Sequence, residues 1–136
     1  MSTLTPSVQR RNSRRARELI HPSTVNCPAT DFRWCEGTEE SDHIYGTDAG
    51  ENIYAYVRDD QIDANGEDDY VDGGRDNDTL YGGEGWDYLD GNVGNDKLFG
   101  VAGQDQLYGY EGDDYLSRRV GDGCYRWQRG QRSGTR

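Results

Sequence analysis

Hydrophobic residues are scarce in this chain, and so is histidine. The 136 residues are 32% hydrophobic, well below the roughly 45–50% of ordinary globular proteins, so a large core is not expected. No apolar run approaches the roughly 18–20 residues of a membrane span, and the first twenty residues lack the apolar centre of a secretory signal peptide. With only His21 and His43, an HExxH zinc site is excluded, and GxSxG and GxxxxGKS motifs are absent. We therefore predict a non-enzymatic protein without a membrane span.

Cysteine is also rare, with three residues in the chain. Cys27 and Cys35 are close enough in sequence to form a local disulfide in an oxidising compartment, which we predict, and Cys124 is left free or intermolecular.

Basic residues are nearly missing from the centre of the chain. Residues 35–117 contain 23 acidic and three basic residues, a net charge of 3 − 23 = −20. Both ends are basic, since residues 1–34 hold six arginines and two acids and residues 118–136 hold six arginines and one acid. Such an acidic centre repels nucleic acid and anionic membranes and attracts cations. We therefore predict that the partner is a cation and that the protein does not bind nucleic acid.

What the sequence does contain is a repeat of nine residues. Written from Gly37, the rows are GTEESDHIY, GTDAGENIY, AYVRDDQID, ANGEDDYVD, GGRDNDTLY, GGEGWDYLD, GNVGNDKLF, GVAGQDQLY and GYEGDDYLS. We number the nine positions of a row as columns one to nine. Column six is acidic in all nine rows, and column eight is always Ile, Val or Leu. A repeat at a fixed period indicates a stack of similar structural units.

Each row divides into a six-residue turn rich in Gly and Asp and a three-residue strand. Alternate side chains of a strand face opposite sides, so column eight faces a core while columns seven and nine face solvent. Two rows, or 18 residues, then make one coil with a strand and a turn on each side. The predicted fold is all-β, with two sheets that meet in a thin core.

This core is too small to order the chain alone. One aliphatic residue per row offsets little of the entropy that ordering nine residues costs, and stacking the coils brings column-six carboxylates together. A divalent cation between the carboxylates would resolve both problems. Oxygen ligands without His or Cys favour calcium over zinc or magnesium, and several calcium ions are expected.

The rows resemble the RTX, or haemolysin-type, calcium-binding nonapeptide GGxGxDxUx, in which U is a large apolar residue. The resemblance covers residues 37–117 and is closest over 73–117. It implies a right-handed parallel β-roll that is disordered without calcium and folds at the high calcium concentration outside cells. It also implies that each ion lies between turns two rows apart, held by column-six Asp side chains and turn carbonyls.

Carried onto this sequence, the resemblance implies ion sites on both edges of the roll. On one edge, the sites combine Gly74, Asp76 and Asp78 with Gly91, Val93 and Asp96, and then Asn92, Gly94 and Asp96 with Gly109, Glu111 and Asp114. On the other edge, Gly83, Gly85 and Asp87 combine with Gly100, Ala102 and Asp105, and a weaker site combines Asn65, Glu67 and Asp69 with Gly82, Glu84 and Asp87.

The early rows depart from the pattern. Glu51 replaces Asp in column six, and Arg58 and Glu67 replace glycine in column four. We therefore expect rungs without ordered calcium there. An EF-hand over residues 61–72 is excluded because Gln61 occupies its first position and flanking helices are absent.

The sequence divides into four segments. We expect a flexible basic segment at 1–26, a cap at 27–36, the calcium-binding roll at 37–117, and a degenerate last rung with an irregular basic tail at 118–136. Tyrosines in column nine predict an exposed ladder, suited to carbohydrate or partner binding or simply to cross-strand stacking; they are Tyr45, Tyr54, Tyr81 and Tyr108.

Three functions are compatible with this pattern. The first is a secreted calcium-binding module that folds on meeting calcium outside the cell and acts as a structural or adhesive element. The alternative is the C-terminal calcium-binding or secretion module of a larger secreted hydrolase or toxin. The third is calcium-dependent recognition of a glycan or cell surface through the tyrosines. Exposed strand edges at the ends of the stack would also allow end-to-end self-association.

Overall fold

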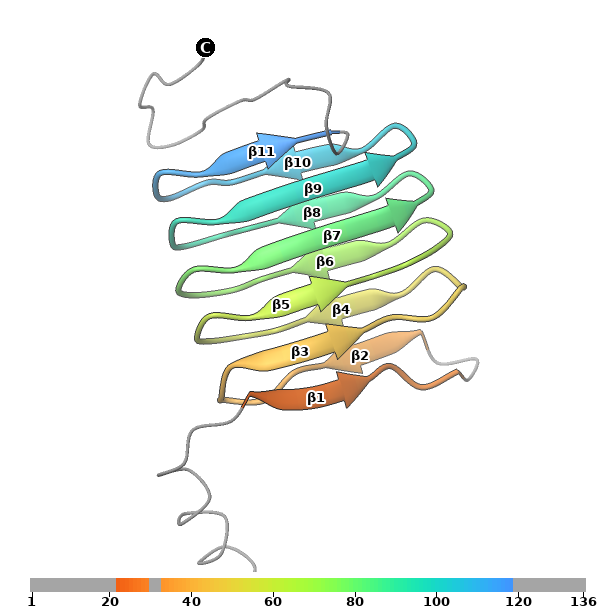
Figure 1. Cartoon of the computed structure of the whole chain (residues 1–136), viewed down its shortest axis with the longest axis horizontal. Coiled ribbons are helices and arrows are strands. Elements are labelled where there is room, and N and C mark those ends of the chain that lie inside the picture. Colours follow the sequence, from red (N-terminus) through yellow and green to blue (C-terminus); the bar gives the residue numbers. More distant parts are fainter. Residues whose placement is uncertain (1–21, 30–32, 119–136) are drawn as a thin grey trace, which may run out of the picture.

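A computed structural model describes residues 22–29 and 33–118 of the chain, and these residues are all-β, without a helix. They wind into a stack of about five turns with about 18 residues per coil, and Figure 1 shows the two sheets lying on opposite sides of the stack. The predicted fold class, a parallel two-sheet β-roll, is confirmed. No helix long and apolar enough to cross a membrane occurs in the described ranges.

Successive strands alternate between the two sheets. The six-stranded sheet has the order β1-β3-β5-β7-β9-β11, with strands Ser23–Asn26, Asp42–Tyr45, Gln61–Asp63, Thr79–Glu84, Lys97–Ala102 and Tyr115–Ser117. The five-stranded sheet has the order β10-β8-β6-β4-β2, with strands Gln106–Tyr108, Tyr88–Asp90, Tyr70–Asp72, Asn52–Tyr54 and Trp34–Glu36.

Neighbouring strands are parallel, and from β2 onward their register follows the repeat. Ile44 pairs with Ile62 in one sheet and Ile53 pairs with Val71 in the other, each 18 residues apart. The nine-residue period therefore sets both the alternation of the sheets and the pairing within each sheet.

The core is a double file of column-eight side chains, as predicted. The column-eight residues Ile44, Ile53, Ile62, Val71, Leu80, Leu89, Leu98 and Leu116 are buried. Leu107 is only partly buried, and among the described residues β10 is the last strand of its sheet.

The predicted bridge between Cys27 and Cys35 is confirmed, and it lies at the N-terminal end of the stack. The flexible segment assigned to residues 1–26 is wrong at its end, because Ser23–Asn26 form strand β1 and pair with β3. Val25 pairs with Ile44, 19 residues away instead of 18, so one extra residue hides this coil from a nine-residue pattern. The other predictions for residues 1–21 and 119–136, including the one for Cys124, concern residues outside the described ranges.

The aromatic side chains form two ladders rather than one. Column nine contributes to both sheets in alternate rows, so Tyr45 and Tyr81 lie on one sheet and Tyr54 and Tyr108 on the other. The five-stranded sheet carries a ladder of Trp34, Tyr54, Tyr70, Tyr88 and Tyr108, with neighbouring ring centroids 4.9–5.7 Å apart. The six-stranded sheet carries Tyr81, Phe99 and Tyr115. The predicted single exposed ladder is therefore wrong, and most of these rings are half-buried by their neighbours.

Candidate metal centres

The column-six carboxylates form two buried files, one along each edge of the roll. Asp78 and Asp96 are 1% exposed. In each file, one carboxylate oxygen accepts the backbone N–H of the column-six residue one coil earlier, as Asp78 Oδ1 does from Asp60 at 2.8 Å. The seven bonds of this kind measure 2.7–3.1 Å. The Asp side chain thus links each coil to the preceding one.

The second carboxylate oxygen of these residues is buried and accepts no hydrogen bond. This holds for Oδ2 of Asp60, Asp69, Asp78, Asp87, Asp96 and Asp105. A buried carboxylate oxygen without a partner is costly, and such groups are normally neutralised, paired or bound to a metal. The unpartnered oxygens of the two files could therefore be ligands of a cation.

The electrostatics of the files agree with this reading. Burial, together with the charge of neighbouring carboxylates, raises the pKa of Asp78 to about 9 and that of Asp69 to about 8. Burial likewise raises the pKa of Asp60 and of Asp96 to about 7 and that of Asp87 to about 6. Without a positive partner, these acids resist ionisation because the charged form is poorly solvated.

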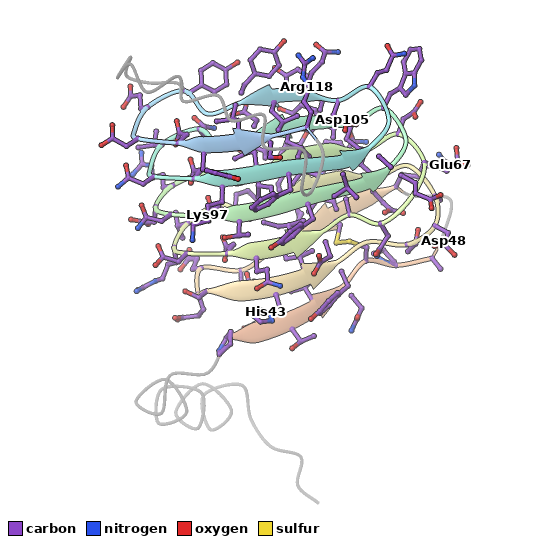
Figure 2. All side chains as sticks on the ribbon, turned by 45° about the horizontal axis from the view of Figure 1, so that its top comes forward. His43, Asp48, Glu67, Lys97, Asp105 and Arg118 are labelled. Atoms are coloured by element: carbon purple, nitrogen blue, oxygen red, sulfur yellow. A yellow bond between two sulfur atoms is a disulfide. The ribbon has the colours of Figure 1, made fainter. Side chains whose placement is uncertain are left out.

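The last carboxylate on one edge has a different neighbour. Burial raises the pKa of Asp105, while the nearby Arg118 guanidinium lowers it. Figure 2 shows these two residues close together at the C-terminal end of the roll. The arginine supplies positive charge beside this carboxylate.

In the first two turns, 37–42 and 46–51, threonine side chains donate hydrogen bonds to the buried carboxylates. The Thr38 Oγ1 donates to both carboxylate oxygens of Asp42 at 3.0 and 3.1 Å, and the Thr38 N–H donates at 2.6 Å. In the next row, the N–H and Oγ1 of Thr47 donate to the two carboxylate oxygens of Glu51. Both oxygens of these carboxylates accept hydrogen bonds, whereas most of the later column-six carboxylates have a bare oxygen, by which we mean a buried oxygen that accepts no hydrogen bond.

The backbone of the turns changes at the same point in the chain. From Tyr56 onward, columns two and four of every turn have positive φ; the residues are Tyr56, Arg58, Asn65, Glu67, Gly74, Asp76, Gly83, Gly85, Asn92, Gly94, Val101, Gly103, Tyr110 and Gly112. Eight of them are not glycine, and Val101 is even β-branched, so the conformation is imposed at a cost. Positive φ repeated at two positions in seven turns, even where the residue is not glycine, points to a functional demand on the turn.

Stacked turns also bring their carbonyl groups together. The Gly74 carbonyl oxygen accepts the N–H of Val93 at 3.0 Å, and the Val93 carbonyl oxygen accepts the N–H of Asp76 at 2.8 Å. Each carbonyl keeps a second lone pair for another partner. No group of three or more His, Cys, Asp or Glu side chains converges within residues 22–29 and 33–118, so a calcium ion would need these main-chain oxygens to complete six to eight ligands.

The predicted ligand residues fall on adjacent stacked turns as expected from the repeat. On one edge, turns 73–78, 91–96 and 109–114 follow one another, and turns 64–69, 82–87 and 100–105 do so on the other. All predicted site residues lie in these six turns: Asp69, Gly74, Asp76, Asp78, Gly83, Gly85, Asp87, Gly91, Asn92, Val93, Gly94, Asp96, Gly100, Ala102, Asp105, Gly109, Glu111 and Asp114. That these residues are calcium ligands is a proposal.

The sequence pattern missed one further turn of this kind. Turn 55–60 has positive φ at Tyr56 and Arg58, pairs with the next turn through Arg75 N–H to Tyr56 O at 3.0 Å, and contains the bare oxygen of Asp60. The Arg58 side chain donates to the Glu39 carbonyl oxygen at 3.2 Å and so leaves this carboxylate unpaired. We add the space between turns 55–60 and 73–78 to the candidate sites. In the sequence, Asp60 in column six indicates this site, but Arg58 in place of glycine in column four argued against it.

Comparison with known proteins agrees with this geometry. The family model described as RTX calcium-binding nonapeptide repeat (4 copies) matches residues 45–80, 63–98 and 90–123, together more than half of the chain. Neither a search of curated proteins nor a search of solved structures found a match.

Proposed function

Because the chain belongs to the RTX calcium-binding nonapeptide repeat family and is a calcium-binding repeat module, we propose that calcium orders its roll outside the cell. In that setting the roll acts as a structural or adhesive element. The observation that carries this proposal is the pair of buried files in which successive Asp residues each have one oxygen without a partner. Calcium supplies the positive charge that these oxygens need, and it links each turn to the next.

Two features support an extracellular site of action. The disulfide between Cys27 and Cys35 is a feature of proteins in oxidising compartments. The candidate sites are formed by turns far apart in sequence, so binding and folding are one event. A ligand that binds only the folded chain stabilises it by about 2.7 kcal/mol per site at a hundredfold excess over Kd, and free calcium is abundant only outside cells.

The proposal is tested by far-UV circular dichroism of the full chain, metal-free and with millimolar calcium. We expect a change from coil to β-sheet over residues 55–117, and a smaller change with magnesium, which prefers a stricter octahedron and retains its waters. An equal β-sheet signal in metal-free and calcium-loaded protein would contradict the proposal.

A single substitution tests whether column-six carboxylates are the ligands. Asp78→Asn removes the charge from a residue that is 1% exposed. It should raise the calcium concentration at the midpoint of the coil-to-sheet transition, the calcium midpoint, about tenfold, or ~1.4 kcal/mol. Asp59→Asn is the matched control. Asp59 is exposed and its Oδ1 accepts the N–H of Asn77, which an Asn oxygen can also do, so we expect a shift of at most about twofold. Equal shifts would show that overall charge, not ligation, sets the midpoint.

A further inference from the structure

The N-terminal end of the roll differs from the rest in having no bare carboxylate oxygen in its two turns. Asp42 and Glu51 are buried like the later acids, at 0% and 4% exposed. Thr38 and Thr47 supply a hydroxyl and an amide donor to each. Hydrogen bonds to a carboxylate are stronger than those between neutral groups, so these buried carboxylates have polar partners without a metal.

The same end is also held together covalently. The disulfide joins Cys27 and Cys35 across the first coil, which reduces the entropy of the unfolded chain. Arg33 adds a bond from Nη1 to the Gly50 carbonyl oxygen at 3.3 Å, and Trp34 stacks on Tyr54 with ring centroids 5.0 Å apart. Very small folding units usually need such a staple.

The hydrogen bonds to the column-six carboxylates all have one direction, unlike the backbone bonds between strands and turns, which run both ways. The N–H of Asp42 donates to Asp60 Oδ1, and the N–H of Glu51 donates to Asp69 Oδ1, both at 2.7 Å. Every later bond in the files runs the same way, from a coil to the carboxylate of the next coil toward the C-terminus. A formed coil therefore offers donors to the carboxylates that follow it.

We propose that residues 23–29 and 33–54 form a calcium-independent cap, held by the disulfide and by the threonine-bonded carboxylates, on which calcium assembles the roll from the N-terminal to the C-terminal end. The metal-free chain is then partly folded rather than wholly unfolded. The first calcium-binding turns, 55–60 and 64–69, receive two amide donors already in position. This inference rests on the proposed function, since calcium must order the later turns.

Hydrogen exchange of the full chain, followed by mass spectrometry or NMR, tests the proposal. In metal-free protein, amides of Asp42–Tyr45 and Asn52–Tyr54 should exchange at least about tenfold more slowly than those of Tyr88–Asp90, a difference of ~1.4 kcal/mol in local opening. Calcium should protect both groups. Similar exchange of the two groups in metal-free protein, with calcium still protecting Tyr88–Asp90, would overturn the cap alone. A chain in which calcium protects neither group would overturn the proposed function as well.

Two variants separate the hydroxyl bonds from general stability. Thr38→Val with Thr47→Val removes the hydroxyl donors and should reduce the metal-free difference to about twofold or less, since each buried carboxylate loses a hydrogen-bond donor. The control is Thr79→Val, on β7, which should keep the difference. Reduction of the disulfide should also lower protection of Asp42–Tyr45 in metal-free protein. A difference that survives both the double substitution and reduction would overturn the proposal.

Discussion

At the scale of single residues, glycine in column four lets successive turns stack closely. Gly94 has φ 148°, outside the region where Arg58 and Glu67 adopt φ 80° and 65° in the same column. A Cβ on Gly94 would also collide with the Asp76 carbonyl oxygen of the preceding coil. The early rows thus accept side chains in column four because their backbone takes a left-handed angle that other residues can reach, at a cost.

This difference gives a matched pair of substitutions. Gly94→Ala should destabilise the calcium-loaded roll by at least about 2 kcal/mol, because strain and the backbone collision add. Gly66→Ala should be nearly neutral, since its nearest contact would be the Asp48 Cα at an ordinary 3.7 Å. Urea unfolding in calcium measures both. A Gly94→Ala protein as stable as the Gly66→Ala protein would show that the turns can separate without loss.

At the scale of the strands, the outer face of each sheet is held by its rings. On the five-stranded sheet, Tyr70 and Tyr88 stack at 5.2 Å with 14° between their planes. Stacked rings turn their faces toward each other and only their edges outward, whereas sugar recognition by aromatic residues uses ring faces. The ladder therefore favours cross-strand stabilisation over carbohydrate binding.

The ladder can be tested at one interior ring. Tyr70→Ala removes contacts with Tyr54 and Tyr88 and should lower the free energy of unfolding by about 2 kcal/mol in calcium. Tyr45→Ala serves as control. Tyr45 is 37% exposed and stacks on no ring among the described residues, so about 0.5 kcal/mol or less is expected. Equal losses would mean that strand propensity, not stacking, explains the rings.

The strands also show why some features could be predicted from the sequence and others could not. Ile, Val and Leu in column eight and acids in column six repeat without a slip, so the sheets, the core and the buried carboxylates followed directly. Strand β1 did not follow, because its pairing is shifted by one residue. The hydroxyl bonds of Thr38 and Thr47 could not be predicted, because threonine occupies column two only in the first two rows and so does not stand out as part of the repeat. The two ring ladders mix columns seven and nine, which only the alternation of sheets reveals.

At the scale of the whole molecule, charge decides whether the roll forms. The stretch 35–117 carries a net charge of 3 − 23 = −20, and folding gathers part of that charge into two narrow files. The folded files must be neutralised either by cations or by protons. Calcium and acid should therefore substitute for each other in part, and they should compete when both are present.

Neutralisation of the files by protons should give the metal-free protein an unusual pH dependence. The pKa of Asp78 is raised from 3.8 to about 9, that of Asp69 to about 8 and that of Asp60 to about 7 in the folded chain. Groups with a raised folded-state pKa stabilise the fold at low pH, and this contribution is lost as the pH rises through those values.

Metal-free protein, dialysed rather than chelated, should thus show more β-sheet at pH 5.5 than at pH 8.5. The calcium midpoint should rise as the pH falls across the same range, because protons occupy the carboxylates. Circular dichroism measures both, with sedimentation as a control for association near the pI of 4.5. A metal-free spectrum that is unchanged between these pH values would show that the files do not limit folding.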